Sequence, residues 1–247
     1  MRILELDLGN SRTKWRLADL GLSGSLPSDE LIQLKALPAD WAGLIVDSIW
    51  LASVLADAAT QAAVGSLQRV FACDVHRAYS SPAAAGVING YAEPNRLGVD
   101  RWLALLAARQ SASGDLVVAD AGTAVTLDLL RADGQHLGGY ILPGVARQAQ
   151  SLWGGTGRVQ VSTQALKPRF EPGDGTEACV EAALTAALMG LCVSAQRRLP
   201  QATWYLTGGD AHWLQAICAR QQLPFRCKSD LVLDGLAHAQ KLPYPAP

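Results

Sequence analysis

The sequence predicts an α/β protein built from two similar halves, chiefly because one motif occurs twice. Asp-x-Gly-x-x-x-Thr is found at residues 7–13 and again at residues 120–126 of the 247-residue chain. Each copy follows an apolar run and precedes a second β-rich stretch, so each half is expected to begin strand, tight turn, strand. Strands then alternate with helical segments, which is typical of an α/β architecture.

The elements expected in the first half follow the chain in order. Residues 3–6 form a first strand, because an apolar stretch this short with an acidic neighbour is not a signal peptide. Residues 14–17 form the second strand, ahead of a turn at Gly21. Residues 47–61 have helix-compatible spacing. The clearest helix is expected over residues 97–112, where apolar residues recur at positions i, i+3, i+4 and i+7.

The second half repeats this start and continues with helices. Residues 116–119 form its first strand, and Asp133-Gly134 between two apolar runs predicts a hairpin. Residues 176–198 are rich in Ala and Leu and predict one long helix. Gly208-Gly209 lies between a short strand and a further helix. Residues 154–175, rich in Gly, Pro and polar side chains, are expected to form either an exposed loop or a hinge between secondary elements.

The composition is that of a globular protein with a sizeable core. Hydrophobic residues make up 49% and charged residues 17% of the chain, which excludes a disordered protein. The length allows one large domain or two small ones, and the repeat places two at residues 1–113 and 114–247. The formal net charge of −1 provides no global basic field, so we expect no nucleic-acid partner.

The cellular context is predicted from spacing and hydropathy. No apolar run approaches the roughly 18 residues that span a bilayer, so we expect no membrane contact. The five cysteines are widely spaced, without a C-x-x-C pair, which argues against a disulfide framework or thiolate zinc site and favours a reducing cytoplasm. The four histidines are equally scattered, which gives little support to a His-based metal site or a Ser-His-Asp triad.

The repeated motif carries groups suited to binding phosphate. Gly9 lets the backbone approach a ligand closely because it has no Cβ, and backbone amides can donate to phosphate oxygens together with the Asn10 and Ser11 side chains. Lys14 adds a positive charge, while Asp7 suits a hydrated Mg²⁺. One copy alone would more simply be a plain β-turn. Two copies, each after an apolar strand, favour a nucleotide triphosphate with its cations.

Three further segments carry weaker signals. Gly208-Gly209 opens a helix, whose N-terminus favours an anion, although such turns also join ordinary strands and helices. Asp100 and Arg101 lie near the first turn of the helix expected over residues 97–112. Either they act on a ligand, or Asp100 merely complements the helix dipole while Arg101 is solvated. Residues 137–144 are typical of a strand that ends in a glycine-rich loop.

Together these segments resemble the motifs of type III pantothenate kinases. Residues 7–14 resemble the first phosphate motif of that family and residues 120–126 the second. Residues 89–91 with residues 97–101 resemble the substrate motif, whose Gly-x-Asp-Arg discriminates this family from sugar kinases and chaperone ATPases that share the phosphate motifs. Residues 138–144 resemble the glycine loop of that family, and residues 207–210 resemble its adenosine motif. Residues 230–236 resemble its usual C-terminal end.

The resemblance implies a duplicated ribonuclease-H-like fold of the actin-like ATPase type, with a cleft between its two similar halves. It implies an ATP-dependent kinase that converts pantothenate to 4′-phosphopantothenate, the first step of coenzyme A biosynthesis. It also implies Mg²⁺, a monovalent cation such as K⁺ or NH₄⁺, and a homodimer whose pantothenate site lies near the subunit interface.

The resemblance further implies roles for individual residues. Asp100 would be the catalytic base, and the charge of Arg101 beside it would keep it ionised. Asp120 would hold the monovalent cation. The residues that would contact ATP are Asp7, Leu8, Gly9, Asn10, Ser11, Arg12, Thr13, Lys14 and Thr123. The residues that would contact pantothenate are Tyr91, Gly98, Val99, Asp100, Arg101 and Thr176.

Two other functions stay open on the sequence alone. One is a kinase of the same superfamily that acts on a sugar or another small alcohol, which kinetics with pantothenate against a panel of alcohols would distinguish. The other is a non-catalytic regulatory accessory protein of the same fold. The presence of Asp7, Asp100 and Asp120 argues against lost catalysis.

Overall fold

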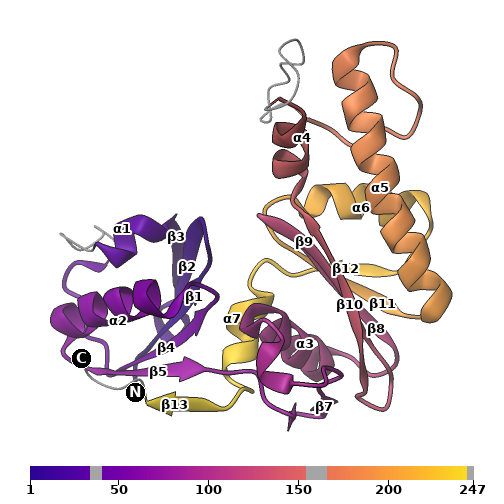
Figure 1. The fold of residues 1–247 in the computed structure, drawn as a ribbon. Helices are drawn as coiled ribbons and strands as arrows, with labels where there is room; N and C mark the ends of the chain where they lie inside the picture. Colours follow the sequence, from indigo (N-terminus) through magenta and orange to yellow (C-terminus); the bar gives the residue numbers. More distant parts are fainter. Residues whose placement is uncertain (34–40, 154–165, 244–247) are drawn as a thin grey trace. The chain divides into compact units, whose positions relative to one another are not determined.

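The structure is a computed structural model that describes residues 1–33, 41–153 and 166–243. It divides into two compact units, of which unit 1 comprises Met1–Gln110 with Leu231–Pro247 and unit 2 comprises Ser111–Asp230 (Figure 1). The first boundary lies close to the expected one at residue 113. The C-terminal segment differs from the expectation, because it belongs to unit 1 and not to the second half.

Unit 1 is built on a sheet whose inner strand β1 is the first of the chain. Six strands cross this sheet in the order β13 (Lys241–Pro243), β5 (Asp74–Ala78), β4 (Ser48–Ser53), β1 (Ile3–Leu8), β2 (Arg12–Leu17) and β3 (Leu22–Pro27). β1 pairs antiparallel with β2 and parallel with β4. Successive side chains of a strand point to opposite faces, so Leu4, Leu6 and Leu8 of β1 share one face, while Glu5 and Asp7 share the other.

Helices pack on both faces of the unit 1 sheet. α1 (Ser28–Ile32) and α2 (Asp57–Phe71) cover the face with the β1 leucines, where Leu31 and Leu67 join the core. α7 (Leu231–Leu236) contacts β1 and β4, and a Cβ on its Gly235 would overlap the backbone of α3 (Val99–Ser111). The smaller elements of unit 1 are η1 (Ala18–Leu20), η3 (Pro94–Arg96), β6 (Ala83–Ala84) and β7 (Val87–Ile88).

Unit 2 repeats the topology of unit 1. Its five strands lie in the order β10 (His136–Pro143), β9 (Ala124–Leu130), β8 (Leu116–Ala121), β11 (Thr203–Thr207) and β12 (Phe225–Cys227). β10, β9 and β8 pair antiparallel, and β8, β11 and β12 pair parallel. This is the pattern of β3, β2, β1, β4 and β5 in unit 1. The duplication predicted from the repeated motif is therefore confirmed.

One face of the unit 2 sheet carries its core. α4 (Val145–Trp153), α5 (Thr176–Arg198) and α6 (Ala211–Arg220) supply the helical side of this core (Figure 1). Leu188 of α5 and Trp213 of α6 pack there with Val117, Ala119 and Trp204 of the sheet. Asp120 alternates with Ala119 along β8 and therefore belongs to the opposite face.

Most expected elements form where the sequence predicts them, including the long helix α5, the helix α3 and the hairpin at Asp133-Gly134. The helix expected over residues 47–61 is wrong in its first part. Residues 48–53 form β4 instead, because Ile49 and Leu51 pair with β1 and are fully buried. The helix α2 begins only at Asp57. Of the expected loop over residues 154–175, residues 154–165 lie outside the described part of the chain.

α5 has the expected bounds, and its apolar character is stronger than expected. It has 23 residues, and an 18-residue window within it has a mean hydropathy of 1.8 with 33% of that window buried. The expectation that no run approaches membrane-spanning length is therefore wrong by length and composition. A single helix of this kind is weak evidence for a membrane span, since core helices of soluble proteins share these properties. Val180, Leu184 and Leu188 of α5 lie in the core of unit 2.

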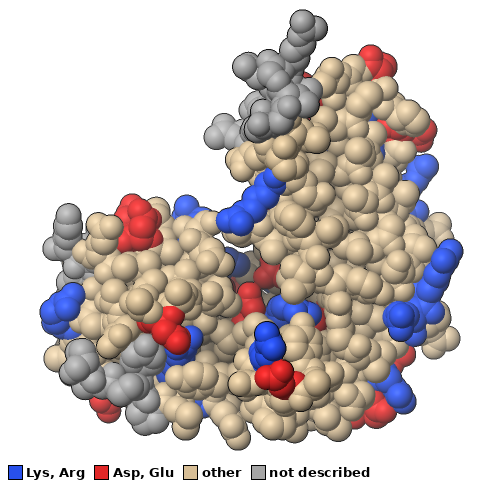
Figure 2. Space-filling view, viewed as in Figure 1, with Lys and Arg blue, Asp and Glu red and all other residues tan. Residues whose placement is uncertain are grey.

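Surface charge is mixed, and the cysteines are unpaired. On the face shown in Figure 2, basic and acidic side chains are interspersed over a mostly uncharged surface. All five cysteines are free. Burial raises the pKa of Cys192 and of Cys218 to about 12, so these two thiols stay protonated at neutral pH.

An ionic network ties the C-terminal segment to the sheet of unit 1. Nε of Arg16 lies 2.6 Å from Oε2 of Glu5, and Nη1 of Arg16 lies 2.6 Å from Oδ1 of Asp234. Burial would lower the pKa of Arg16, but the hydrogen bonds and charges of the two carboxylates outweigh burial and raise it. β13 adds antiparallel pairing with β5. These contacts place the C-terminal segment in unit 1.

Replacing Arg16 by methionine is expected to destabilise unit 1 strongly. Glu5 is 7% exposed, and removing one partner of a buried ion pair costs about 3–5 kcal/mol. The matched change Arg2→Met breaks the exposed pair with Asp19 and should cost at most about 1 kcal/mol. Denaturant unfolding followed by circular dichroism measures both changes. Equal losses for the two variants would contradict a buried role for Arg16.

Candidate functional site

The first copy of the motif forms a tight turn at the carboxyl end of β1. The Gly9 N–H donates to the Arg12 carbonyl at 3.2 Å. A Cβ on Gly9 would lie 2.9 Å from that same oxygen, so the turn requires glycine here. Asn10 and Ser11 at the tip are exposed. Their side chains are therefore accessible to a ligand.

Strand register sorts the other side chains of this motif onto two faces. Asp7 of β1 pairs with Lys14 of β2, and Leu8 pairs with Thr13. Residues directly opposite each other share a face of the sheet, so Asp7 and Lys14 lie together on the face opposite α1 and α2. Leu8 and Thr13 lie on the helix-covered face and are fully buried. These two residues can reach a ligand only through their backbone.

Arg12 extends toward the edge strand β3. Its Nη2 donates to Oγ of Ser25 at 2.7 Å and to the Ser25 carbonyl at 3.3 Å. The guanidinium of this predicted ATP-binding residue is therefore engaged with β3 in this structure.

The second copy of the motif forms a turn at the carboxyl end of β8. The Gly122 N–H donates to the Ala124 carbonyl at 2.9 Å. Ala121 pairs with Val125, so three residues separate the last paired residues here, whereas four separate the pair Leu8 and Thr13 in unit 1. Asp120 is half-buried at the end of its strand, as Asp7 is in unit 1.

The one-residue difference changes the role of the threonine in the motif. Asp120 is directly opposite Thr126, so these two side chains share a face. In unit 1 the position opposite Asp7 is taken by Lys14, and Thr13 faces the other way. Two identical motifs thus present different groups beside the carboxylate.

Two glycines from distant parts of unit 2 pack against the second turn. A Cβ on Gly144 would overlap the Gly122 carbonyl, and the Gly144 N–H donates to the Thr123 carbonyl at 3.0 Å. A Cβ on Gly208 would overlap Asp120, and the φ of +95° at Gly208 also favours glycine. The structure therefore brings together the second phosphate motif, the glycine loop and the Gly-Gly turn.

The start of α3 holds the predicted base. Oδ1 of Asp100 accepts the Arg101 N–H at 2.7 Å. A Cβ on Gly98 would lie 2.6 Å from this oxygen, so glycine makes room for the carboxylate. Arg101 is 7% exposed. Its Nη1 donates to the Tyr91 hydroxyl at 2.8 Å, and its guanidinium lies 5.6 Å from the centroid of that ring. The alternative in which Arg101 is solvated is therefore wrong.

Asn89 supports Tyr91, a role that the sequence did not reveal. Asn89 is 8% exposed, and its Nδ2 donates to the carbonyls of Ser81 and Pro94 at 3.2 and 3.1 Å. Its Oδ1 accepts the Tyr91 N–H at 3.0 Å. The sequence Asn-Gly-Tyr could have suggested this contact, because Asn side chains often form hydrogen bonds with the backbone two residues further along the chain.

A small cavity adjoins the same helix. It has a volume of about 290 Å³, and Gly98 and Val99 form part of its lining together with Arg77 and Arg96. Tyr91 and the pair at the start of α3 are not among the described residues that line it. Only two of the predicted pantothenate contacts in unit 1 therefore face this cavity.

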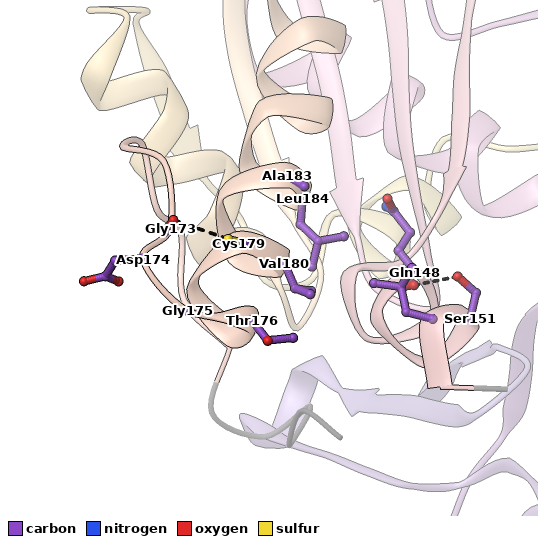
Figure 3. Close-up of a pocket in the computed structure, with 11 residues that line it drawn as sticks. Gln148, Ser151, Gly173, Asp174, Gly175, Thr176, Cys179, Val180, Ala183 and Leu184 are labelled. Carbon is purple, nitrogen blue, oxygen red and sulfur yellow. Dashed lines mark hydrogen bonds between the residues drawn. The ribbon is translucent and has the colours of Figure 1, made fainter. Parts of the chain in front are cut away.

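Thr176 lies apart from the second turn. It begins α5 and lines a cavity of about 940 Å³ between α4 and the loop that precedes α5 (Figure 3). Gln148 and Ser151 line the α4 side, and Val180 and Leu184 line the α5 side. No residue of the second turn is among the described residues that line this cavity. Within unit 2, the structure does not bring Thr176 to the other motif residues.

The oxygen donors at the two turns fit hard cations. Asp7 and Asp120 are half-buried carboxylates at strand ends. Across residues 1–33, 41–153 and 166–243, no group of three His, Cys, Asp or Glu side chains could hold a metal ion by itself. Mg²⁺ is usually bound through one or two carboxylates together with substrate phosphates and waters. The donors present therefore suit a divalent cation that arrives with a nucleotide.

Solved structures share this fold at low sequence identity. A protein of Campylobacter jejuni named as a Baf family transcriptional activator matches with a TM-score of 0.66 at 20% identity, over 95% of both chains. A Sinorhizobium meliloti protein assigned as a 2-dehydro-3-deoxygalactonokinase matches with a TM-score of 0.56 at 14% identity, over 95% of this chain and 94% of that one. These likenesses show the fold alone, which is a duplicated fold of the actin-like ATPase type.

Sequence relatives have a higher identity to this chain than these solved structures. A Pseudomonas fluorescens protein named type III pantothenate kinase is 39% identical over 254 residues, which cover 96% of this chain and 98% of the relative. A protein of the same name from Chromobacterium violaceum is 36% identical over 252 residues, with the same coverage. The sequence profile described as type III pantothenate kinase matches residues 3–198. With both copies of the repeated motif and the Asp100-Arg101 helix start in place, the chain belongs to the type III pantothenate kinase family.

Proposed function

We propose that this protein transfers the γ-phosphate of ATP to pantothenate and so forms 4′-phosphopantothenate, the first step of coenzyme A biosynthesis. The match to type III pantothenate kinases over 96% of the chain carries the proposal. Sugar kinases match only in fold, at 12–14% identity, so the sequence favours pantothenate over a sugar. A kinase of this family uses ATP and a divalent metal.

The phosphate-binding groups are assigned to both turns. Phosphoryl transfer depends mainly on positioning and on neutralising charge. In the first turn, Leu8 and Thr13 would contribute backbone groups, and Asn10 and Ser11 would donate from exposed side chains. Gly9 keeps the turn tight. The remaining groups assigned to ATP are Asp7, Arg12, Lys14 and Thr123.

The cations are assigned to the two strand-end carboxylates. Mg²⁺ would neutralise the charge that develops on the transferred phosphoryl group, and Asp7 is the acceptor that we assign to it. Asp120 would hold K⁺ or NH₄⁺, because a half-buried carboxylate benefits from a counter-charge.

Pantothenate is assigned to the residues around α3 and to Thr176. Asp100 would accept the hydroxyl proton as the bond to phosphorus forms, which makes an alcohol a better nucleophile. Gly98 and Val99 would contact the substrate beside it, and Tyr91 and Arg101 would act as a hydrogen-bonded pair. Thr176 would come from the partner subunit of a homodimer in the cytoplasm.

A coupled ADP-release assay tests the reaction itself. ADP release should require pantothenate, should fail with a panel of sugars, and should fall sharply in a Na⁺ buffer freed of K⁺ and NH₄⁺. ADP release with a sugar and not with pantothenate would overturn the proposed function. Full activity in the Na⁺ buffer would overturn only the monovalent site at Asp120.

Asp100→Asn is expected to lower kcat by about 10²- to 10⁴-fold, the usual range for losing a general base. The substitution keeps size and shape but removes the acceptor charge. Binding of ATP should change little, because the phosphate turns are untouched. Steady-state kinetics and an ATP titration on folded protein measure both effects.

The control for this variant is Asp19→Asn, which neutralises a surface carboxylate of the same unit and should leave kcat unchanged. An Asp100→Asn enzyme that keeps more than about a tenth of wild-type kcat lies outside the expected range. That result would assign Asp100 to substrate orientation or to the helix start.

Mixing two inactive variants tests the shared site. In a two-fold symmetric dimer, a mixed dimer of Asp100→Asn and Thr176→Arg subunits would hold one intact site and one doubly damaged site. Random exchange of equal amounts should therefore restore about a quarter of wild-type activity, since half of the dimers are mixed. A mixture that stays inactive after exchange is demonstrated by mass spectrometry would exclude a site shared in this way.

A further inference from the structure

Ser28, which begins α1, lies directly beneath the first phosphate turn. It is 2% exposed. Its Oγ donates to the Gly9 carbonyl at 2.7 Å and lies 3.1 Å from Oγ1 of Thr13, and its backbone N–H donates to the Ser11 carbonyl at 3.2 Å. One buried residue outside the motif thus contacts three residues of the turn.

The direction of these hydrogen bonds follows from the number of protons available. A serine hydroxyl has one proton and two acceptor lone pairs. Because the Ser28 proton goes to the Gly9 carbonyl, the Thr13 hydroxyl must be the donor in its contact with Ser28. Thr13, which is itself fully buried, therefore donates to Ser28 from the helix-covered face of the sheet.

The bond to Gly9 also fixes the next amide. In a trans peptide the C=O and the N–H point in opposite directions, and the structure contains no cis peptide in its described part. With the Gly9 oxygen held toward buried Ser28, the Asn10 N–H must point away from the core, at the exposed tip of the turn. Glycine has an unusually free backbone, so a hydrogen bond from outside the turn is needed to fix the orientation of the Gly9–Asn10 peptide.

We propose that Ser28 is a positioning residue for ATP, which holds the Gly9–Asn10 peptide with its N–H toward the nucleotide phosphates. A flipped peptide would present a carbonyl oxygen there and repel the anion. The inference rests on the proposed function in one respect, the assignment of residues 7–14 to the ATP phosphates. It adds a residue that lies outside every motif of the chain.

The two turns differ in what holds them. The second turn is held by Gly144 and Gly208, whose backbones pack against it, so any side chain there disturbs the whole region. At the first turn, the Gly9 carbonyl accepts a hydrogen bond from the side-chain hydroxyl of Ser28. That hydrogen bond can be removed by deleting one oxygen atom.

Ser28→Ala should raise both the KM for ATP and the Kd of ATP about tenfold. This is the effect of losing one hydrogen bond to a charged group, here the bond from the Asn10 N–H to a phosphate. The KM for pantothenate should stay within about twofold. Ser28→Cys keeps the shape with a weaker hydrogen bond and should give an intermediate KM for ATP. It also serves as the test variant if Ser28→Ala does not fold. Kinetics give both KM values, and calorimetry with ATP alone gives the Kd.

Ser66→Ala is the matched control. Ser66 is also 2% exposed, and its Oγ donates to the carbonyl of Ile32 at 3.2 Å, at the other end of α1. This variant should lose stability without a change in the Kd of ATP. An unchanged Kd in Ser28→Ala, or an equal rise in Ser66→Ala, would overturn the proposal.

The calorimetric measurement separates this proposal from the proposed function. Calorimetry needs no phosphoryl acceptor. A protein whose ATP affinity depends on Ser28 but which does not phosphorylate pantothenate would therefore refute the reaction and leave the role of Ser28 intact. A wild-type protein active on pantothenate, with ATP affinity indifferent to Ser28, would refute the role of Ser28 alone.

Discussion

The part of the candidate site in unit 2 depends on main chain packed directly against main chain where β8, β10 and β11 end. At the turn after β8, Gly144 and Gly208 approach so closely that even a methyl group would overlap the backbone or Asp120. Three segments that are distant in sequence therefore end at one place, and no side chain can separate them. The sheet order, with a parallel strand on one side of β8 and an antiparallel strand on the other, keeps these ends side by side.

The two units share a fold, but the side chains beside the carboxylates of their motifs differ. The same seven-residue spacing occurs in both units, yet a turn one residue longer in unit 1 places Lys14 beside Asp7, where unit 2 has Thr126 beside Asp120. Lysine adds a positive charge beside the carboxylate of the first turn, whereas threonine adds a neutral hydroxyl beside that of the second. The register difference therefore gives the two turns different electrostatics.

The sequence predicts the architecture because the signals are local: apolar runs, glycine turns and a repeated motif. The prediction fails where the structure of a segment depends on pairing with residues distant in sequence. Residues 48–53 sit next to an alanine-rich stretch that favours a helix, and only pairing with β1 makes them a strand. The burial of Arg101 against Tyr91 follows from a loop that folds back ten residues. Ser28 acts on Gly9 across nineteen residues, and no pattern in the chain marks that contact.

The return of the C-terminal segment to unit 1 has a consequence for biosynthesis. The chain enters unit 2 after Gln110 and leaves it at Asp230, so unit 2 is an insertion within unit 1. On the ribosome, all of unit 2 is synthesised before α7, β13 and Asp234 exist. Domains generally fold as units during synthesis, with the N-terminal one first. In this chain unit 1 begins before unit 2 but is completed after it, because Arg16 and Glu5 gain their contact with Asp234 only once residues 111–230 have been synthesised.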